Sequence, residues 1–145
     1  MIAGFGFNKM SVEKFKAPQG KIDINNNVSI KDLKEDTLPI GKDKDNGVSV
    51  LKFIFEFTSK YEPEIGIMVF EGEILYMENP KKIKEILSSW NKTKQIPKEI
   101  MAGLLNTILT KCNVKALILS QDVNLPSPIP LPKVQMSQGD KSYIG

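Results

Sequence analysis

One stretch near the end of the chain constrains the fold most, because it predicts a long helix that needs a surface to cover. Between residues 97 and 121, apolar side chains recur at helical spacing and form one stripe: Ile100, Met101, Leu104, Leu105, Ile108, Leu109 and Cys112. Pro97 suits the first turn of a helix, where a missing backbone N–H costs nothing. An apolar stripe of this length has to be buried, so the rest of the chain must supply a partner surface.

Four earlier stretches predict the strands of such a surface. Apolar residues alternate at a period of two over residues 2–15, 21–33, 48–58 and 65–77, which is typical of strands in a sheet. The third stretch is the clearest, with Phe53, Phe55 and Phe57 on one face and Ile54 on the other. We expect both faces of this strand to be mostly covered.

The connections between these strands favour an antiparallel sheet. Polar residues fill positions 34–47, and Asn46-Gly47 is a strong signal for a hairpin turn before the third strand. A second turn is expected at residues 61–64, where Glu62-Pro63 precedes the fourth strand. The pattern predicts a four-stranded antiparallel sheet.

A short helix follows the strands. Asn79 is a good N-cap and Pro80 belongs at the first helical position, while Ile83, Ile86 and Trp90 lie on one face before a polar linker at residues 91–96. Strands followed by helices predict an α+β fold in which two helices pack on one face of the sheet. We divide the chain into a domain at residues 1–124 and an extended proline-rich tail at residues 125–145, whose last residues, 135–145, are expected to be loose.

The composition excludes several classes of enzyme. The chain has no His and one Cys, so it lacks His-based triads, Cys–His pairs and thiolate zinc clusters. Cys112 lies on the apolar stripe and is interpreted as a small buried hydrophobe, with a reactive thiol as the weaker alternative. Glu71 and Glu73 share a strand face but nothing nearby would tune their pKa values. We expect no catalytic residues, no metal site and no cofactor.

Length and apolar runs bear on the location of the protein. The 145 residues suffice for one domain with its own core, and the single Cys indicates a reducing compartment. No run approaches the ~18 apolar residues of a membrane span, and the first residues lack a basic region followed by an apolar core. We expect a cytoplasmic protein with neither a membrane nor a small-molecule substrate as a partner.

The formal charge of +3 is unevenly distributed along the chain. Residues 1–79 carry 10 Lys against 13 Asp and Glu, and residues 80–145 carry 10 Lys against 4. Six of the lysines form a dense group at the first helix and its linker: Lys81, Lys82, Lys84, Lys92, Lys94 and Lys98. Such a group neutralises phosphates, and the alternative is a solvated polar face. The absence of Arg leaves point charges only, without bidentate recognition.

An aromatic group offers a second candidate surface. It consists of Phe53, Phe55, Phe57, Met68 and Phe70 on two predicted strands. These residues form either the core beneath the helices or an apolar binding groove. The core is the favoured interpretation because two helices need a surface to cover.

Several motifs resemble a small archaeal SecB-like family. They are Tyr61-Glu62-Pro63-Glu64-Ile65-Gly66, Lys81-Lys82-Ile83-Lys84-Glu85-Ile86-Leu87 followed by Trp90, Ile96-Pro97-Lys98-Glu99-Ile100, and Leu125-Pro126-Ser127-Pro128-Ile129-Pro130-Leu131-Pro132-Lys133-Val134. The resemblance covers about residues 2–134, and its proline-rich ending is the most specific part. It implies the SecB-like fold, known from the bacterial export chaperone SecB.

The resemblance implies a component of the archaeal large ribosomal subunit. In that role the six lysines and Lys133 would contact rRNA phosphates, and the tail would lie against RNA or neighbouring ribosomal proteins. The mild net charge favours a peripheral position. The alternative is a SecB-like holdase, a homo-oligomer that shelters unfolded polypeptide on apolar surface.

Overall fold

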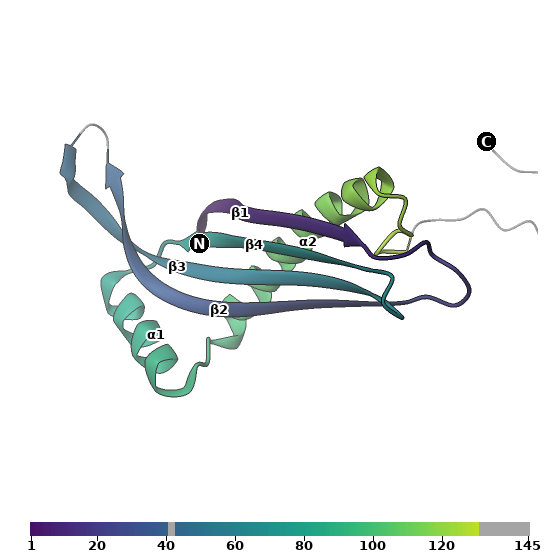
Figure 1. Ribbon diagram of the computed structural model, residues 1–145. Helices are drawn as coiled ribbons and strands as arrows, with labels where there is room; N and C mark the ends of the chain where they lie inside the picture. The colour runs from purple at the N-terminus through teal and green to yellow at the C-terminus, as the bar shows by residue number, and fades with distance from the viewer. Residues whose placement is uncertain (41–42, 131–145) are drawn as a thin grey trace, which may run out of the picture.

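The computed structural model describes residues 1–40 and 43–130, without the side chains of residues 40 and 43–46. Four strands precede two helices, in the order β1 (Ile2–Lys14), β2 (Asp23–Ile40), β3 (Asp43–Glu62), β4 (Gly66–Tyr76), α1 (Pro80–Thr93) and α2 (Lys98–Asp122). The strands form one antiparallel sheet in the order β1-β4-β3-β2. Figure 1 shows α2 crossing behind the sheet and α1 beside β2. The predicted α+β architecture is confirmed.

The core lies between the sheet and the helices, and β3 supplies its centre. Phe53, Phe55 and Phe57 are fully buried, whereas the alternate residues Lys52, Ile54, Glu56 and Thr58 are half-buried on the outer face. The register places Phe57 beside Phe70 of β4, and their rings stack with centroids 5.5 Å apart. One face of β3 is therefore core, and the expectation that both faces are covered holds only in part.

The outer face of the sheet is polar at its middle. Lys52 Nζ lies 2.9 Å from Asp36 Oδ2 and 3.8 Å from Glu73 Oε2 across three strands. The hydrogen bond from Lys52 lowers the pKa of the Asp36 carboxyl. Glu73 thus has a basic neighbour, whereas the sequence predicted nothing nearby.

The hairpin of β2 and β3 is longer than the sequence pattern predicts. Most of the polar stretch at residues 34–47 is strand, and Asn46 and Gly47 lie inside β3, so the predicted turn at these two residues is wrong. Gly47 pairs with Pro39 of β2, and a Cβ at position 47 would collide with the Thr37 side chain. This glycine allows close approach of the neighbouring strand, which explains its presence without a turn.

Helix α1 begins as predicted. The Asn79 side chain accepts a hydrogen bond of 2.8 Å from the Lys82 backbone N–H, and Pro80 follows at the first helical position. Ile83, Ile86 and Trp90 are buried. The helix continues past Trp90 to Thr93, where Lys94 adopts a left-handed conformation with φ 56° and ends it.

Helix α2 buries a narrower stripe than the sequence predicts. The residues fully or nearly buried follow a spacing of four: Ile100, Leu104, Ile108, Cys112, Ala116 and Ser120. Met101 and Leu105 are half-buried and Leu109 is exposed, so their placement in the buried stripe is corrected. A row at spacing four drifts around the helix, which is how a straight helix touches a sheet that it crosses obliquely.

Candidate polypeptide-binding surface

The aromatic group is not available to a ligand in this structure. Phe53, Phe55, Phe57, Met68 and Phe70 have no exposed surface beneath the helices. The interpretation of this group as core is confirmed. An apolar binding surface must therefore lie elsewhere on the molecule.

Three of the exposed large apolar side chains among the described residues lie on α2, and the others are Met1, Met10 and Phe15. Part of the exposed surface of this helix, which we call the α2 outer face, consists of Ala102, Gly103, Asn106, Leu109, Thr110, Val114 and Ile118, and Lys111 and Lys115 are also exposed on α2. Leu109 is 37% exposed, Val114 56% and Ile118 49%. Along this face the first half carries small or polar side chains and the second half carries branched apolar ones. A helix that is apolar on both sides and packed on one has a surface still to be covered.

The chain turns back toward the sheet directly after α2, as Figure 1 shows. Asn124 adopts a left-handed conformation with φ 59°. The Leu125 N–H donates to the Ser120 carbonyl at 2.8 Å, and the Asn124 N–H donates to the Gln121 carbonyl at 3.3 Å. This pair of bonds is a Schellman motif, in which Asn takes the position usually held by glycine. The motif fixes the direction in which the next residues leave the helix.

Residues 125–130, which we call the strap, cross the end of the sheet on its core side. Leu125 is buried against Gly66 of β4, where a Cβ would lie 3.3 Å from a Leu125 methyl carbon. The Tyr61 hydroxyl of β3 donates to the Pro126 carbonyl at 2.7 Å. The Asn26 side-chain amide of β2 donates to the Pro128 carbonyl at 3.0 Å. The strap therefore spans three strands in succession, and its apolar residues pack back on the domain.

Two buried groups give this end of the sheet a distinct chemistry. Burial raises the pKa of Tyr61 to about 12, so its hydroxyl keeps the proton that it donates to the strap. Ser59 lies two residues away on the same face of β3, is fully buried, and its hydroxyl has no hydrogen-bond partner among the described residues. Asn26 pairs with Ser59 in the register. Polar groups from two strands thus lie beneath the strap, and we use the word groove for the surface that the strap covers, formed by Asn26, Tyr61 and Gly66.

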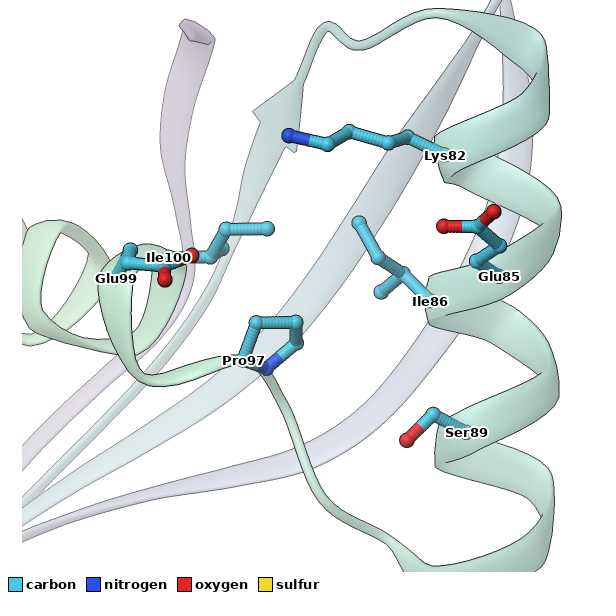
Figure 2. A pocket seen from close by; sticks show the side chains of 7 residues that line it. All are labelled: Lys82, Glu85, Ile86, Ser89, Pro97, Glu99 and Ile100. Atoms are coloured by element: carbon cyan, nitrogen blue, oxygen red, sulfur yellow. The ribbon is translucent and has the colours of Figure 1, made fainter.

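The six predicted phosphate-binding lysines in the described part of the chain are exposed, but they do not form one site. Lys81, Lys84 and Lys92 lie on the outer side of α1 at helical spacings. Lys82 faces the gap between the helices (Figure 2), and Lys94 lies over the Trp90 ring with its Nζ 5.1 Å from the centroid. Lys98 is the first residue of α2, and Lys133 lies outside the described residues.

A small pocket lies where α1 meets the start of α2. Figure 2 shows its lining, which combines Ile86 and Ile100 with polar side chains from both helices. Its volume is about 130 Å³. Cofactor pockets usually reach at least ~300 Å³, so this one is too small to hold a cofactor.

The structure also bears on metal binding and the single thiol. In the described parts of the chain, no three Cys, Asp or Glu side chains are arranged to hold a metal ion. Cys112 is fully buried in the core, and burial raises the pKa of its thiol to about 12. The thiol is therefore unreactive at neutral pH, which confirms its interpretation as a buried hydrophobe.

Helix α2 is long and apolar enough to cross a membrane by length and composition, so the expectation that no run approaches a membrane span is corrected. Its mean hydropathy over the best window is 1.2, and 22% of that window is buried. The same helix contributes a row of buried residues to the core with the sheet. Its exposed remainder includes the α2 outer face.

Comparison with known proteins relates this architecture to solved structures. No protein-family model and no curated protein matches the sequence. The structure is similar to the Mycobacterium tuberculosis Rv1957 SecB-like chaperone, solved in complex with a ChAD peptide from the Rv1956 HigA1 antitoxin, with a TM-score of 0.53. The likeness covers 93% of this chain and 89% of that chain, at 12% sequence identity. The fold is SecB-like. None of these comparisons supports the expected archaeal ribosomal role.

Sequence reasoning missed the residues that hold the strap. The alternation of proline and apolar residues predicted an extended segment, and its packing against the domain was left open. Asn26 stands in the run Asn25 to Asn27 and carries no pattern that separates it from its neighbours. Tyr61 was placed in a turn, whereas it lies near the end of β3 with its side chain on the core face.

Proposed function

We propose that this protein is a SecB-like chaperone that binds unfolded polypeptide and assembles into a homo-oligomer through α2. The observation that carries the proposal is the α2 outer face, because a SecB-like layer is present and its long helix is apolar on the side away from the sheet. The proposal involves no catalytic step and places the protein in the cytoplasm.

The α2 outer face has a shape suited to pairing with a second copy. In an antiparallel pair with a twofold axis near Thr110, Ala102 of one copy faces Ile118 of the other, and Asn106 faces Val114. A small or polar residue of one copy then meets a branched apolar residue of the other at each of these positions, which allows close packing of two helices. A twofold contact of this kind is self-complementary and closes on itself. The apolar area of both helices leaves water together.

Gly103 provides a test of this assembly that spares the fold. A side chain at position 103 would meet nothing within 4 Å in one copy. We expect Gly103→Leu to dissociate the oligomer while the monomer stays folded, since glycine is the poorest of the ordinary helix formers. Sedimentation equilibrium measures the mass and circular dichroism the fold. An unchanged mass for a folded variant contradicts the α2 contact.

The fold likeness supports a polypeptide as the partner. The solved SecB-like chaperone holds a peptide from an antitoxin, which is a segment of another protein. In this chain a segment of polypeptide that belongs to no ladder, the strap, already lies on the sheet. Both observations favour a surface that accepts polypeptide.

The chaperone activity is tested by suppression of aggregation. A reduced and alkylated test protein, which stays unfolded, aggregates when it is diluted from denaturant, and light scattering follows the process. We expect the purified protein to suppress this scattering at near-stoichiometric amounts and an unrelated folded protein of similar size to have no effect. Full aggregation in the presence of an excess of the protein would contradict the proposal.

The lysines favour a second candidate function, peripheral docking on rRNA of the large ribosomal subunit. The supporting observation is that all six described lysines are exposed, with three of them on one side of α1. Point charges of this kind give an attraction to phosphate that falls as salt rises. The tail and neighbouring ribosomal proteins would complete the contact.

Sedimentation of a native lysate separates the two candidates. Docking on rRNA predicts migration with the large subunit at low salt, loss at high salt, and loss when the six lysines are replaced by glutamine. The control is the replacement of three exposed lysines outside the helices, Lys9 and Lys14 of β1 and Lys16 just after it. Migration at the top of the gradient as a small oligomer favours the chaperone.

A further inference from the structure

The strap is held in a way that differs from every other extended segment of the described chain. The four strands pair through backbone ladders, whereas the strap crosses three strands and meets them through the side chains of Tyr61 and Asn26. These two side chains donate to carbonyl oxygens two residues apart, Pro126 and Pro128. Every polypeptide carries such carbonyls, so the two donors recognise extended backbone without reading its sequence.

The strap sequence suits this crossing. A segment that runs across strands has no ladder partner for its N–H groups, and a buried N–H without a partner is costly. Three of the six strap residues are prolines, which have no N–H to leave unpaired. The Ser127 hydroxyl accepts from the Ile129 N–H at 3.3 Å and so satisfies one of the others. Apolar, proline-containing chain is therefore the chemistry that this groove accepts.

One buried polar group beside the groove makes no hydrogen bond to the strap. The Ser59 hydroxyl is fully buried beside the groove and has no partner among residues 1–40 and 43–130. Leu125 and Pro128 are the buried apolar contacts of the strap, while Pro130 is exposed. Side-chain hydrogen bonds from Tyr61 and Asn26 and the buried side chains of Leu125 and Pro128 hold the strap on the sheet, whereas each strand is held by a backbone ladder. The strap is the segment of this layer that is easiest to displace.

We propose that the groove beneath the strap is a polypeptide-binding site which the strap occupies in cis, and that an extended, apolar, proline-containing segment of an unfolded chain binds there by displacing it. The inference rests on the proposed chaperone function and names its binding site. Tyr61 and Asn26 hold the carbonyls of the incoming segment, and the site of Leu125 receives an apolar side chain. A tethered occupant has a high effective concentration, so the strap reduces the apparent affinity for any other segment.

A labelled peptide with the strap sequence Leu-Pro-Ser-Pro-Ile-Pro tests the groove directly by fluorescence anisotropy. The full chain with Leu125→Ser and Pro128→Ser is expected to bind it at least about tenfold more tightly than the unaltered chain, because the competing strap is weakened. Pro130→Ser alters the exposed end of the strap and is the matched control, with unchanged affinity. Adding Tyr61→Phe to the double variant is expected to reduce the gain. Equal affinity of a folded double variant and the unaltered chain would overturn the proposal.

A reversible crosslink covers the case in which the double variant does not fold. Asn26→Cys with Pro128→Cys places two thiols where the strap meets β2, and the native Cys112 is too buried to interfere. The oxidised chain is expected to lose binding of the peptide and of the unfolded test protein, and reduction is expected to restore both. Unchanged binding by the oxidised, folded chain would overturn the proposal.

The two proposals fail in different ways. Suppression of aggregation that is unaffected by the crosslink leaves the chaperone function and removes the groove as its site. Peptide binding that follows the strap, in a protein that does not suppress aggregation, leaves the groove and removes the chaperone function.

Discussion

The two helices of this protein differ in the side chains that they expose to water. Helix α1 buries Ile83, Ile86 and Trp90 and turns a lysine-rich face outward, and its first turn is capped by the Asn79 side chain. Helix α2 buries a row of residues against the sheet but is also apolar on its other side. It begins without a side-chain cap. The first helix has one apolar face, and the second carries apolar side chains on its exposed side as well.

We infer from this difference that α1 contributes to folding alone, whereas α2 contributes to folding and to the proposed assembly. A helix with one apolar face contributes to stability alone, because its outer face is already in favourable contact with water. A helix with two apolar faces is stabilised by the sheet on one side and leaves the other for a partner. Changes in α1 should therefore alter stability only, while changes in α2 should alter stability or assembly, according to the face.

The largest effect is expected from charges on the α2 outer face. Val114→Asp with Ile118→Asp places carboxylates where two copies meet, and burial of each original side chain is worth about 1.5–3 kcal/mol. We expect the dissociation constant of the oligomer to rise at least about 100-fold. Analytical ultracentrifugation measures it, and Ser88→Asp on the exposed side of α1 is the control. A folded double variant of unchanged mass would show that α2 is not the contact.

Truncating a side chain in the buried row of α2 should lower the free energy of unfolding. Leu104 has no exposed surface, and Leu104→Ala is expected to lower the free energy of unfolding by about 2–5 kcal/mol because it leaves a cavity. Leu109→Ala, on the exposed side of the same helix, should lower it much less at a protein concentration where the oligomer is dissociated. Urea titration followed by circular dichroism measures both. Equal losses would mean that Leu109 is buried in the monomer.

Removing the α1 cap is expected to have a moderate effect. Asn79→Ala leaves the Lys82 N–H without its acceptor and should lower the free energy of unfolding by about 1 kcal/mol. The mass of the oligomer should not change, since α1 lies outside the proposed contact. Asn79→Ser retains a capping oxygen and should recover most of the loss. A change in mass would contradict the division of roles between the helices.

The smallest effect appears only at alkaline pH. Burial raises the pKa of the Cys112 thiol from 9.0 to about 12, so the folded chain keeps a proton that the unfolded chain releases in this range. The contribution to stability is complete below pH 9.0 and is lost as the pH rises toward 12. Cys112→Ala should therefore lose less stability than the unaltered chain between these values, as chemical denaturation at each pH measures. Parallel curves would indicate that the thiol is accessible in the folded state. Tyr61, raised from 10.0 to about 12, acts in the same sense in both chains.

Much of the fold follows from local patterns. Period-two alternation located all four strands, and Asn79-Pro80 located the start of α1, because these signals depend on neighbouring residues only. The length of the hairpin was not predictable in this way. A polar run such as residues 34–47 looks like a loop, and it forms strands here because both strands pair with each other beyond the end of the core. Gly47 looks like a turn residue because Asn-Gly commonly forms hairpin turns, whereas here Gly47 pairs with Pro39 inside the hairpin.

The candidate sites were predicted less well. The lysine group is visible in sequence because charges stand close together, yet the structure directs Lys82 into the gap between helices and Lys94 over Trp90. The groove combines Asn26, Tyr61 and the strap, which lie far apart in the chain and carry no shared motif. The α2 outer face could not be predicted, because α2 is apolar on several sides and its sequence does not distinguish the buried side from the exposed one. Only the structure shows which side the sheet covers.

The position of the strap in the sequence determines when it is synthesised relative to the strands that it covers. Every strand and both helices precede residue 125, so during synthesis the groove is assembled from residues made before the segment that fills it. Asn26, Tyr61 and Gly66 leave the ribosome well ahead of Leu125. The strands that carry the two donors of the proposed site are therefore complete before the strap itself is made.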